Sequence, residues 1–230
     1  MLNKGQYTIN QNVFFNNIIK KKRIEIADII KQEVNKKKLK INSILDIGSS
    51  SDKESNFSNI ILKNLNFTLN IKSITNRKIQ SKLFKKIMIR SITKKFSKKM
   101  IKNFMADLVL SSATIEHVGS ISCQKKMIEN IGYLTKKIFI ITTPYRYFPI
   151  EVHTKIPFLH FLPKKIFRKI LNLFNYNFFA KEKNLNLLTI NELKGLSKNL
   201  EKKYYLKIQF IKTFFFISNL ILIGIKKNDK

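Results

Sequence analysis

Short apolar runs alternate with amphipathic stretches along the 230 residues of this chain. Apolar runs bounded by turn-forming residues are typical of buried strands, and apolar residues at helical spacing indicate helices. The pattern predicts strands over 41–47, 67–74, 106–110, 137–143, 204–210 and 219–225. It predicts helices over 14–34, 57–65, 122–134 and 189–200. The basic tract 76–105 has a mixed period and predicts only one short helix or strand.

Strands and helices therefore follow one another in the order expected of an α/β fold. Several strands are apolar throughout, which is typical of a parallel sheet with helices on both faces. The strands at 204–210 and 219–225 are close in sequence, so we expect them to pair antiparallel at the edge of the sheet. Ligands bind beyond the carboxyl ends of parallel strands, so the residues after each strand are the candidates for a functional site.

The first candidate lies where the strand at 41–47 ends, in the sequence SILDIGSSSD. Asp46 lies in an otherwise apolar strand, where a carboxylate is costly to bury without a partner. Gly48 allows a tight turn and the close approach of a ligand. The backbone amides and hydroxyls of Ser49 and Ser50 can hold a polar cofactor. A plain turn from strand to helix, capped by a serine, fits the same residues.

The second candidate is ADLVLSSATIEHVGS, in which the strand at 106–110 delivers Ser111 and Ser112 to the same edge of the sheet. An adjacent acid and imidazole follow, Glu116 and His117. Either can act as a general base or orient a substrate hydroxyl, because histidine titrates near neutrality. In the alternative, Glu116 caps the next helix and His117 packs in the loop.

The third candidate, ITTPYRYFPIEVHT, follows the strand at 137–143. It places arginine, tyrosine, Glu151 and His153 where the rim of a pocket is expected. It also opens an insertion over about 145–187, which holds three of the four prolines and many aromatic residues. An aromatic lid without a chemical role fits this composition equally well.

A basic amphipathic helix is predicted at 163–174 within the insertion. Its apolar stripe consists of Ile166, Phe167, Ile170, Leu171 and Phe174. Lysine and arginine residues occupy the opposite face, and such a helix can lie on an anionic bilayer. Peripheral contact with a membrane is therefore one prediction, and a lid helix that packs on its own domain is the simpler one.

The formal charge of +31 suggests, at first sight, a polyanionic partner or an anionic membrane surface. Only five of the 45 basic residues are arginine, however, and asparagine, isoleucine and phenylalanine are abundant. An AT-rich genome favours this residue set and places lysine at any tolerant surface position. A solvated, lysine-rich surface therefore explains the charge, and nucleic acid is not the expected partner.

The single cysteine, Cys123, excludes a disulfide within the chain and fits a reducing compartment. The N-terminus lacks the apolar stretch of a signal peptide, and the most apolar segment, 214–225, is too short to span a bilayer. These features predict a soluble cytoplasmic protein, with peripheral contact at the inner membrane as the only membrane association. His117, His153 and His160 are not spaced as ligands on one helix, so no metal site is predicted.

Five segments, taken in order, resemble the class I S-adenosylmethionine-dependent methyltransferases. ILDIGSSSD resembles their first motif, and ADLVLSSATIEHVGS resembles the motif after their fourth strand in the small-molecule, type 11 branch. The run IFIITTPYRYFPIEVHTKIPFLHFLP, with NLNLLTINELKGL and SNLILIGIKK after it, is similar to a bacterial subgroup of that branch. Members of the subgroup often lie among genes for cell-surface polysaccharides or lipids. The resemblance covers about residues 41–228.

The resemblance implies a Rossmann-like, mostly parallel seven-stranded sheet with helices on both faces and an antiparallel edge strand. It implies S-adenosylmethionine as the cofactor. We expect an N-terminal helical segment over 1–40 and a methyltransferase-like domain over 41–230, with the insertion at about 145–187 as a lid.

Carried over to matching residues, the resemblance also implies a site at three strand ends. The cofactor side would consist of Asp46, Gly48, Ser49, Ser50, Ser111 and Ser112. The substrate side, which includes any catalytic residues, would consist of Glu116, His117, Glu151 and His153. In most such enzymes, alignment of the acceptor with the methyl group can matter more than acid–base chemistry.

The chain departs from the family pattern where the ribose of the cofactor would lie. The family normally supplies a carboxylate after the second strand that holds both ribose hydroxyls, and often another near the adenine. Here no acidic residue lies between Glu54 and Asp107. Ser73 or Asn76 can replace the ribose acid, but neutral hydrogen bonds are about half as strong as charge-assisted ones.

Three functions follow from these observations. The leading prediction is methyl transfer from S-adenosylmethionine to an oxygen or nitrogen of a small acceptor, or of one linked to a lipid or sugar. The acid-free tract leaves open a degenerate, non-catalytic member that binds a partner or a membrane. The net charge leaves open an RNA methyltransferase, although the sequence shows no added RNA-binding module.

Overall fold

The computed structural model describes residues 13–52, 54, 59–65 and 70–227, with side chains from residue 16 onward. Its helices are α1 (Val13–Lys36), α2 (Ile60–Asn64), α3 (Lys98–Phe104), α4 (Ile121–Leu134), α5 (Lys164–Leu173) and α6 (Ile190–Ser197). Its strands are β1 (Ser43–Ile47), β2 (Asn70–Thr75), β3 (Lys86–Ile89), β4 (Ala106–Ser112), β5 (Thr135–Pro144), β6 (Tyr204–Thr213) and β7 (Phe216–Lys226). Short 3-10 helices are η1 (Ile115–His117), η2 (Leu159–Phe161) and η3 (Lys198–Lys202).

The described strands form one seven-stranded sheet in the order β3-β2-β1-β4-β5-β7-β6. β1 pairs parallel with β2 and β4, and β5 continues the parallel part beside β4. β7 runs antiparallel to both β5 and β6. The predicted fold class is therefore confirmed, including the antiparallel pairing of the last two strands at one edge.

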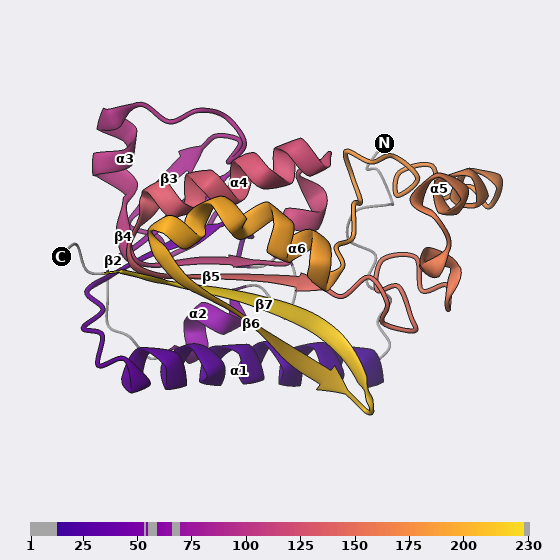
Figure 1. Ribbon diagram of the computed structural model, residues 1–230, viewed down its shortest axis with the longest axis horizontal. Coiled ribbons are helices and arrows are strands. Elements are labelled where there is room, and N and C mark those ends of the chain that lie inside the picture. Colours follow the sequence, from indigo (N-terminus) through magenta and orange to yellow (C-terminus); the bar gives the residue numbers. More distant parts are fainter. Residues whose placement is uncertain (1–12, 53, 55–58, 66–69, 228–230) are drawn as a thin grey trace.

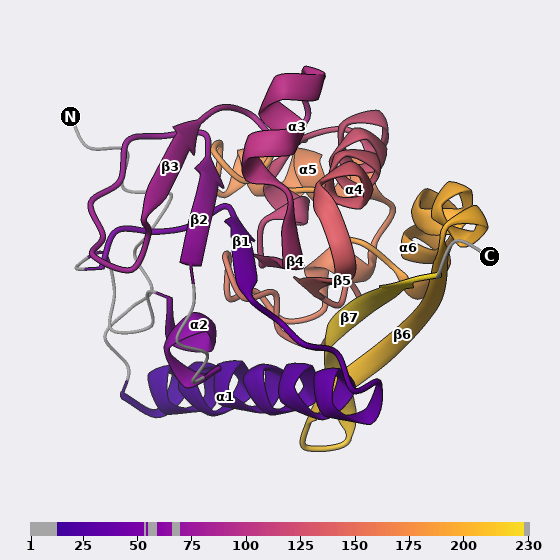
Figure 2. The ribbon, with the colours of Figure 1, turned by 90° about the vertical axis from the view of Figure 1, so that its left-hand side faces the viewer.

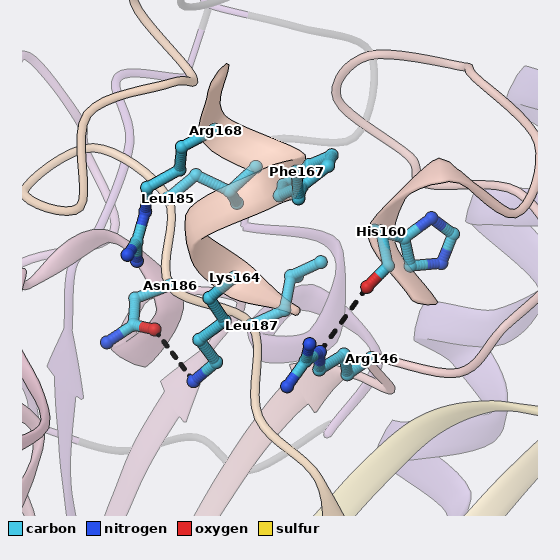
Figure 3. A pocket seen from close by; sticks show the side chains of 8 residues that line it. All are labelled: Arg146, His160, Lys164, Phe167, Arg168, Leu185, Asn186 and Leu187. Atoms are coloured by element: carbon cyan, nitrogen blue, oxygen red, sulfur yellow. Dashed lines mark hydrogen bonds between the residues drawn. The ribbon is translucent and has the colours of Figure 1, made fainter. Parts of the chain in front are cut away.

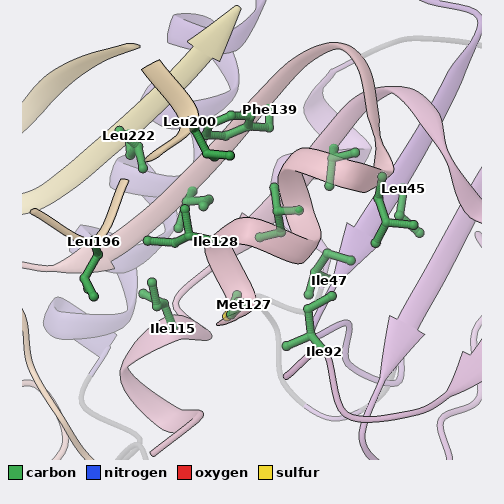
Figure 4. Packing of buried hydrophobic residues seen from close by; sticks show 14 of the residues in the cluster. Leu45, Ile47, Ile92, Ile115, Met127, Ile128, Phe139, Leu196, Leu200 and Leu222 are labelled. Carbon is green, nitrogen blue, oxygen red and sulfur yellow. The ribbon is translucent and has the colours of Figure 1, made fainter. Parts of the chain in front are cut away.

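Helices cover both faces of the sheet, with α1 and α2 on one side and α3, α4 and α6 on the other (Figure 1, Figure 2). Successive strand residues point to opposite faces. Ile44 therefore packs in the cluster that contains Ile30 of α1, whereas Leu45 packs in the cluster that contains Met127 of α4 (Figure 4). These two cores fix the sheet, and with it the edge at which the parallel strands end.

The helices after β4 and after the insertion begin at side-chain caps. Thr189 starts a capping box. Its hydroxyl accepts from the backbone N–H of Glu192 at 3.2 Å, and the Glu192 carboxylate accepts from the backbone N–H of Thr189 at 2.8 Å. At the start of α4, the Ser120 hydroxyl accepts from the backbone N–H of Cys123 at 3.4 Å. Ser120, and not Glu116, therefore caps the helix after β4.

The insertion at about 145–187 lies beyond the carboxyl end of β5 (Figure 1). It has a hydrophobic cluster of its own, formed by Phe167, Leu171, Phe179, Ala180, Leu185 and Leu187. Two residues of the predicted apolar stripe, Phe167 and Leu171, are thus buried inside the insertion, while Ile166 and Phe174 are exposed. Among the described helices, none is both long and apolar enough to cross a membrane.

Sequence and structure differ most between β2 and β4. The tract 76–105 was expected to hold one short element, and it holds both β3 and α3. β3 lies at the sheet edge and has no fully buried residue, so its alternation of apolar and polar residues is weak. Residues 57, 58 and 67–69, which belong to the predicted second helix and second strand, lie outside the described residues.

Lysines mark both edges of the sheet. β6 pairs with β7 alone, and β3 pairs with β2 alone. β6 carries Lys207 and Lys212, and β3 begins with Lys86. Lys207 also forms an ion pair with Glu33 of α1 at 2.5 Å, which links the N-terminal helix to the edge strand.

β7 approaches β5 closely at Gly224, which lies opposite Phe139 in the register. A Cβ at this position would overlap the ring of Phe139, and that ring is fully buried. We expect Gly224→Ala to lower the free energy of unfolding by about 1–3 kcal/mol through overpacking. Urea denaturation measures the loss, with Gly195→Ala in α6 as the control because its Cβ meets nothing within 4 Å. Equal stabilities for the two variants would contradict the prediction.

Candidate functional site

The loop after β1 is held by a chain of hydrogen-bonded side chains. Ser73 of β2 lies opposite Asp46 in the parallel register, and its hydroxyl donates to that of Ser49 at 2.8 Å. The Ser49 hydroxyl donates in turn to the Asp46 carboxylate. Burial raises the pKa of Asp46 to about 6, against the lowering effect of this hydrogen bond. Asp46 thus has the polar partner that its buried position requires.

Gly48 brings the loops after β1 and β4 into contact. Its φ of +84° lies in the left-handed region, which glycine adopts at little cost. A Cβ there would overlap the side chain of Thr114, whose hydroxyl donates to the backbone oxygen of Ser112 at 3.0 Å. Gly48 is exposed and Ser50 is half-buried. The backbone of Gly48 is therefore accessible to a ligand, while the other side of the loop rests on the β4 turn.

The acids nearest the end of β2 are already engaged. Glu54 forms an ion pair with Arg77 at 2.5 Å. Asp52 accepts from the Ser81 hydroxyl at 2.8 Å and from the backbone N–H of Lys82 at 3.0 Å. Burial would raise the pKa of Asp52, but these hydrogen bonds lower it. Both carboxylates thus hold the loop after β1 against the segment that follows β2.

Ser73 and Asn76, the predicted replacements for a ribose carboxylate, differ in accessibility. Ser73 is fully buried within β2, and its hydroxyl is donated to Ser49. Asn76 is exposed one residue beyond the end of β2. Of the two, Asn76 is therefore the residue with a side chain open to a ligand.

The two serines at the end of β4 connect neighbouring strands. The Ser111 hydroxyl donates to the backbone oxygen of Ile47 at 3.3 Å. The Ser112 hydroxyl accepts from the Thr142 hydroxyl at 3.1 Å. Ser111 is fully buried and Ser112 is half-buried. Ser112 is therefore the more accessible of the pair.

Glu116 is fully buried in η1, directly after these serines. Its Oε2 accepts from the Thr143 hydroxyl at the end of β5, at 2.9 Å. Its Oε1 has no hydrogen-bond partner among the described residues and lies 3.9 Å from Nε2 of His117. A carboxylate in this position is oriented by Thr143 and keeps one oxygen for further chemistry.

Glu151 and His153 join this group from the segment after β5. Nδ1 of His153 lies 2.6 Å from Oε1 of Glu151, which is itself buried. The ring centroids of His117 and His153 are 4.8 Å apart, and the rings are nearly perpendicular. The structure thus brings together the four residues predicted for the substrate side, Glu116, His117, Glu151 and His153, although they come from two distant segments.

Glu151, His153 and His117 have shifted pKa values. Burial alone would raise the pKa of Glu151, but His153 and the backbone N–H groups of His153 and Thr154 lower it to about 2. Burial would lower the pKa of His153, but the carboxylates of Glu151 and Glu116 raise it. Burial lowers the pKa of His117 in spite of the carboxylate of Glu116. The surroundings therefore raise the pKa of His153 and lower that of His117.

Sequence reasoning missed the groups that hold this cluster. Thr143 is the last residue of the strand predicted over 137–143, and this place at a strand end was the signal that could have identified it as a site residue. The backbone oxygen of Asn184 lies 2.6 Å from Nδ1 of His117. The Asn186 side chain donates to the backbone oxygen of Gly119 at 2.9 Å. Neither asparagine carries a sequence signal, because each is brought to the site by the fold of the insertion.

Two small open hollows lie in the insertion. One, of about 240 Å³, lies beneath α5 (Figure 3). There Lys164 donates to the Asn186 side chain at 2.9 Å and Arg146 to the backbone oxygen of His160 at 3.4 Å. The other, of about 180 Å³, is lined in part by Glu151. Of the four clustered residues, the second hollow is lined by Glu151 alone.

No protein-family model matches the sequence, and no curated protein matches it. The fold is nevertheless that of the S-adenosylmethionine-dependent methyltransferases. The chain is similar to the plantazolicin methyltransferase BpumL in complex with SAH, with a TM-score of 0.55 and 11% identity over 92% of this chain and 87% of that one. It is similar to 1,6-didemethyltoxoflavin-N1-methyltransferase from Burkholderia thailandensis, with a TM-score of 0.51 and 9% identity over 90% and 79%.

The small RNA methyltransferase HEN1 contains the same fold. The TM-score is 0.54 at 14% identity, over 91% of this chain and 25% of that one. At such identities the likeness shows the fold, and it confirms the fold that the sequence motifs implied.

Proposed function

We propose that this chain transfers a methyl group from S-adenosylmethionine to an oxygen or nitrogen of a small acceptor, or of one linked to a lipid or sugar. The observation that carries the proposal is the contact between Gly48 and Thr114. It joins the loop expected to hold the cofactor to the turn that bears Glu116 and His117. Cofactor and acceptor groups would then meet at one edge of the sheet, as ligands do in folds of this kind.

The end of β1 fits the amino-acid moiety of this cofactor. The exposed backbone of Gly48 permits close approach, and Ser50 lies half-buried beside it. The ribose end fits less well, because β2 ends without a carboxylate and Asp52 and Glu54 have other partners. When bound, S-adenosylmethionine supplies an electrophilic methyl group.

The residues of the chain would align the acceptor and take up its proton. Glu116 or His117 would accept that proton as the acceptor atom bonds to the methyl carbon and the carbon–sulfur bond breaks. Oε1 of Glu116 and Nε2 of His117 are 3.9 Å apart, so both can face one acceptor group. Glu151 holds the ring of His153 through the 2.6 Å contact, which would help to orient the acceptor.

Calorimetric titration with S-adenosylhomocysteine tests the proposal. We expect saturable heat below millimolar ligand. No heat at millimolar ligand would instead favour the non-catalytic alternative, which the missing ribose carboxylate supports.

RNA as the acceptor is a second candidate, supported by the net charge of +31 and by the fold shared with HEN1. It requires RNA binding that weakens steeply as the salt concentration rises. The absence of binding to single-stranded RNA at low salt would remove this candidate.

Membrane contact through 163–174 stays a prediction. The exposed fractions of Leu173 and Phe174, 80% and 65%, support it. Phe167 and Leu171 are buried in the insertion's own cluster, which keeps these two residues of the apolar stripe from a bilayer and supports a packed lid helix. Co-sedimentation with anionic vesicles decides between them.

Asn76→Asp is expected to tighten the binding of S-adenosylhomocysteine about tenfold. A carboxylate at this position would form charge-assisted hydrogen bonds with the ribose, about twice as strong as those of an amide. Asn172→Asp in α5 is the matched control, because it makes the same charge change at an exposed position in the insertion. Equal affinities for both variants would show that Asn76 does not contact the ribose.

A further inference from the structure

Three side chains that can ligate a metal converge at the carboxyl edge of the sheet. Glu116 and His117 come from η1, and His153 comes from the segment after β5. One ligand atom from each lies within 4.8 Å of the others. With metal bonds of about 2.1 Å in tetrahedral geometry, ligand atoms lie about 3.4 Å apart, so the three side chains would have to close by about 1 Å around an ion. The sequence predicted these residues for the substrate side but not as metal ligands, because they lie on two segments and not on one helix.

The hydrogen bonds of the two histidines leave one nitrogen of each ring free. Nδ1 of His117 lies 2.6 Å from the backbone oxygen of Asn184, and Nδ1 of His153 lies 2.6 Å from a carboxylate oxygen of Glu151. Both partners can only accept, so Nδ1 carries the proton in each ring. In the neutral rings the lone pair on each Nε2 is then available to a metal ion, and binding to a charged His153 would release its second proton.

The buried oxygen of Glu116, unpartnered in the described part of the chain, points to a ligand. Its side chain is 0% exposed, and Oε1 has no hydrogen-bond partner among the described residues. A buried carboxylate oxygen without a partner is costly, and such atoms call for an explanation. Oε1 lies 3.9 Å from Nε2 of His117, on the side where the imidazoles lie. A cation between them would satisfy it.

Each of the three side chains is also held by a second residue. Thr143 donates to the other oxygen of Glu116 at 2.9 Å. Asn184 and Glu151 hold the two imidazoles through Nδ1. Metal-binding histidines usually donate their second N–H to a carbonyl or a carboxylate in this manner, which fixes the ring and its tautomer.

We propose that Glu116, His117 and His153 form a binding site for one divalent transition-metal ion. Two imidazoles and one carboxylate favour ions such as Zn²⁺, Co²⁺, Mn²⁺ and Fe²⁺ over Mg²⁺ and Ca²⁺, which prefer oxygen ligands. Three protein ligands leave at least one coordination position open. An acceptor oxygen would occupy that position, an assignment that rests on the proposed function. With the ion bound, Glu116 and His117 would act on the acceptor through the ion and would not take up its proton themselves.

The test is a titration of the metal-stripped full chain, prepared without an affinity tag, with Co²⁺. We expect visible absorption bands that saturate at about one equivalent and disappear when Zn²⁺ is added, since both ions suit such a ligand set. His117→Ala, His153→Ala and Glu116→Gln should each weaken Co²⁺ binding by at least about tenfold to 100-fold, and Glu151→Gln by about tenfold. His160→Gln is the matched control, because His160 bonds to Phe148 through Nε2 and lies outside the cluster.

Glu116→Gln preserves the shape of the side chain, so it tests the site even if the alanine variants fail to fold. The absence of a saturable Co²⁺ band in the unchanged chain would overturn the proposal. Binding that persists in Glu116→Gln, or that His160→Gln also removes, would overturn it as well. Titration of the same samples with S-adenosylhomocysteine separates the two proposals, because a failed metal site leaves cofactor binding intact and a failed cofactor site leaves Co²⁺ binding intact.

Discussion

Gly48→Ala is expected to weaken the binding of S-adenosylhomocysteine by about 100-fold, equivalent to about 2.8 kcal/mol. The backbone of Gly48 has φ at +84°, where a side chain is strained. The added Cβ would also overlap Thr114, so the loop after β1 must move away from the β4 turn. Calorimetry measures the loss of affinity, and thermal unfolding shows whether the fold persists.

Gly119→Ala is the control for this result. Gly119 also has positive φ, at +104°, but the nearest atoms to a Cβ there lie 3.7 Å or more away. It therefore introduces backbone strain without moving the loop after β1. If the two alanine variants bound S-adenosylhomocysteine equally well, the loop at Gly48 would not be part of the cofactor site.

Glu116→Gln is expected to lower the rate of methyl transfer by about 10²- to 10⁴-fold, the usual contribution of a positioned acid or base. Glutamine keeps the size of the side chain and can still accept from Thr143. The variant loses the negative charge of a carboxylate whose Oε1 is buried and has no hydrogen-bond partner among the described residues. The affinity for S-adenosylhomocysteine should stay within about twofold of that of the unchanged chain, because the substitution alters a residue on the acceptor side and none on the cofactor side.

Transfer of labelled methyl groups from S-adenosylmethionine to a panel of small phenols, sugars and amines measures this rate. Glu201→Gln in η3 is the matched control, because Glu201 is exposed and distant in sequence from the cluster. A Glu116→Gln rate close to that of Glu201→Gln would show that Glu116 has no direct part in the reaction.

The sheet could be predicted from the sequence wherever a strand is buried on both faces. Ile44–Ile47 and Ile138–Ile141 are almost entirely buried, so selection for apolar residues marks them clearly. The sequence did not distinguish β3 from the residues around it. An edge strand is buried on one face at most, and the four residues of β3 are all partly or fully exposed. The long irregular insertion likewise shows no simple period, so only its composition could be interpreted.

The sequence could propose individual residues for the candidate site, but not the contacts that connect them. Asp46 and Gly48 are conspicuous because a buried acid and a glycine at a strand end need a physical reason. The partners of Glu116 and His117 depend on how β5 and the insertion pack, and these contacts span 27 and 67 residues. Local patterns carry no information about contacts of such separation.

The lysines at the open edges of the sheet bear on the behaviour of the protein at high concentration. An edge strand can recruit the edge of another copy and begin aggregation, and lysine along the edge opposes such pairing. Lys212 on β6 and Lys86 on β3 would bring like charges together in an edge-to-edge assembly, whereas Lys207 is paired with Glu33. Edge lysines of this kind account for part of the large positive charge without any anionic ligand.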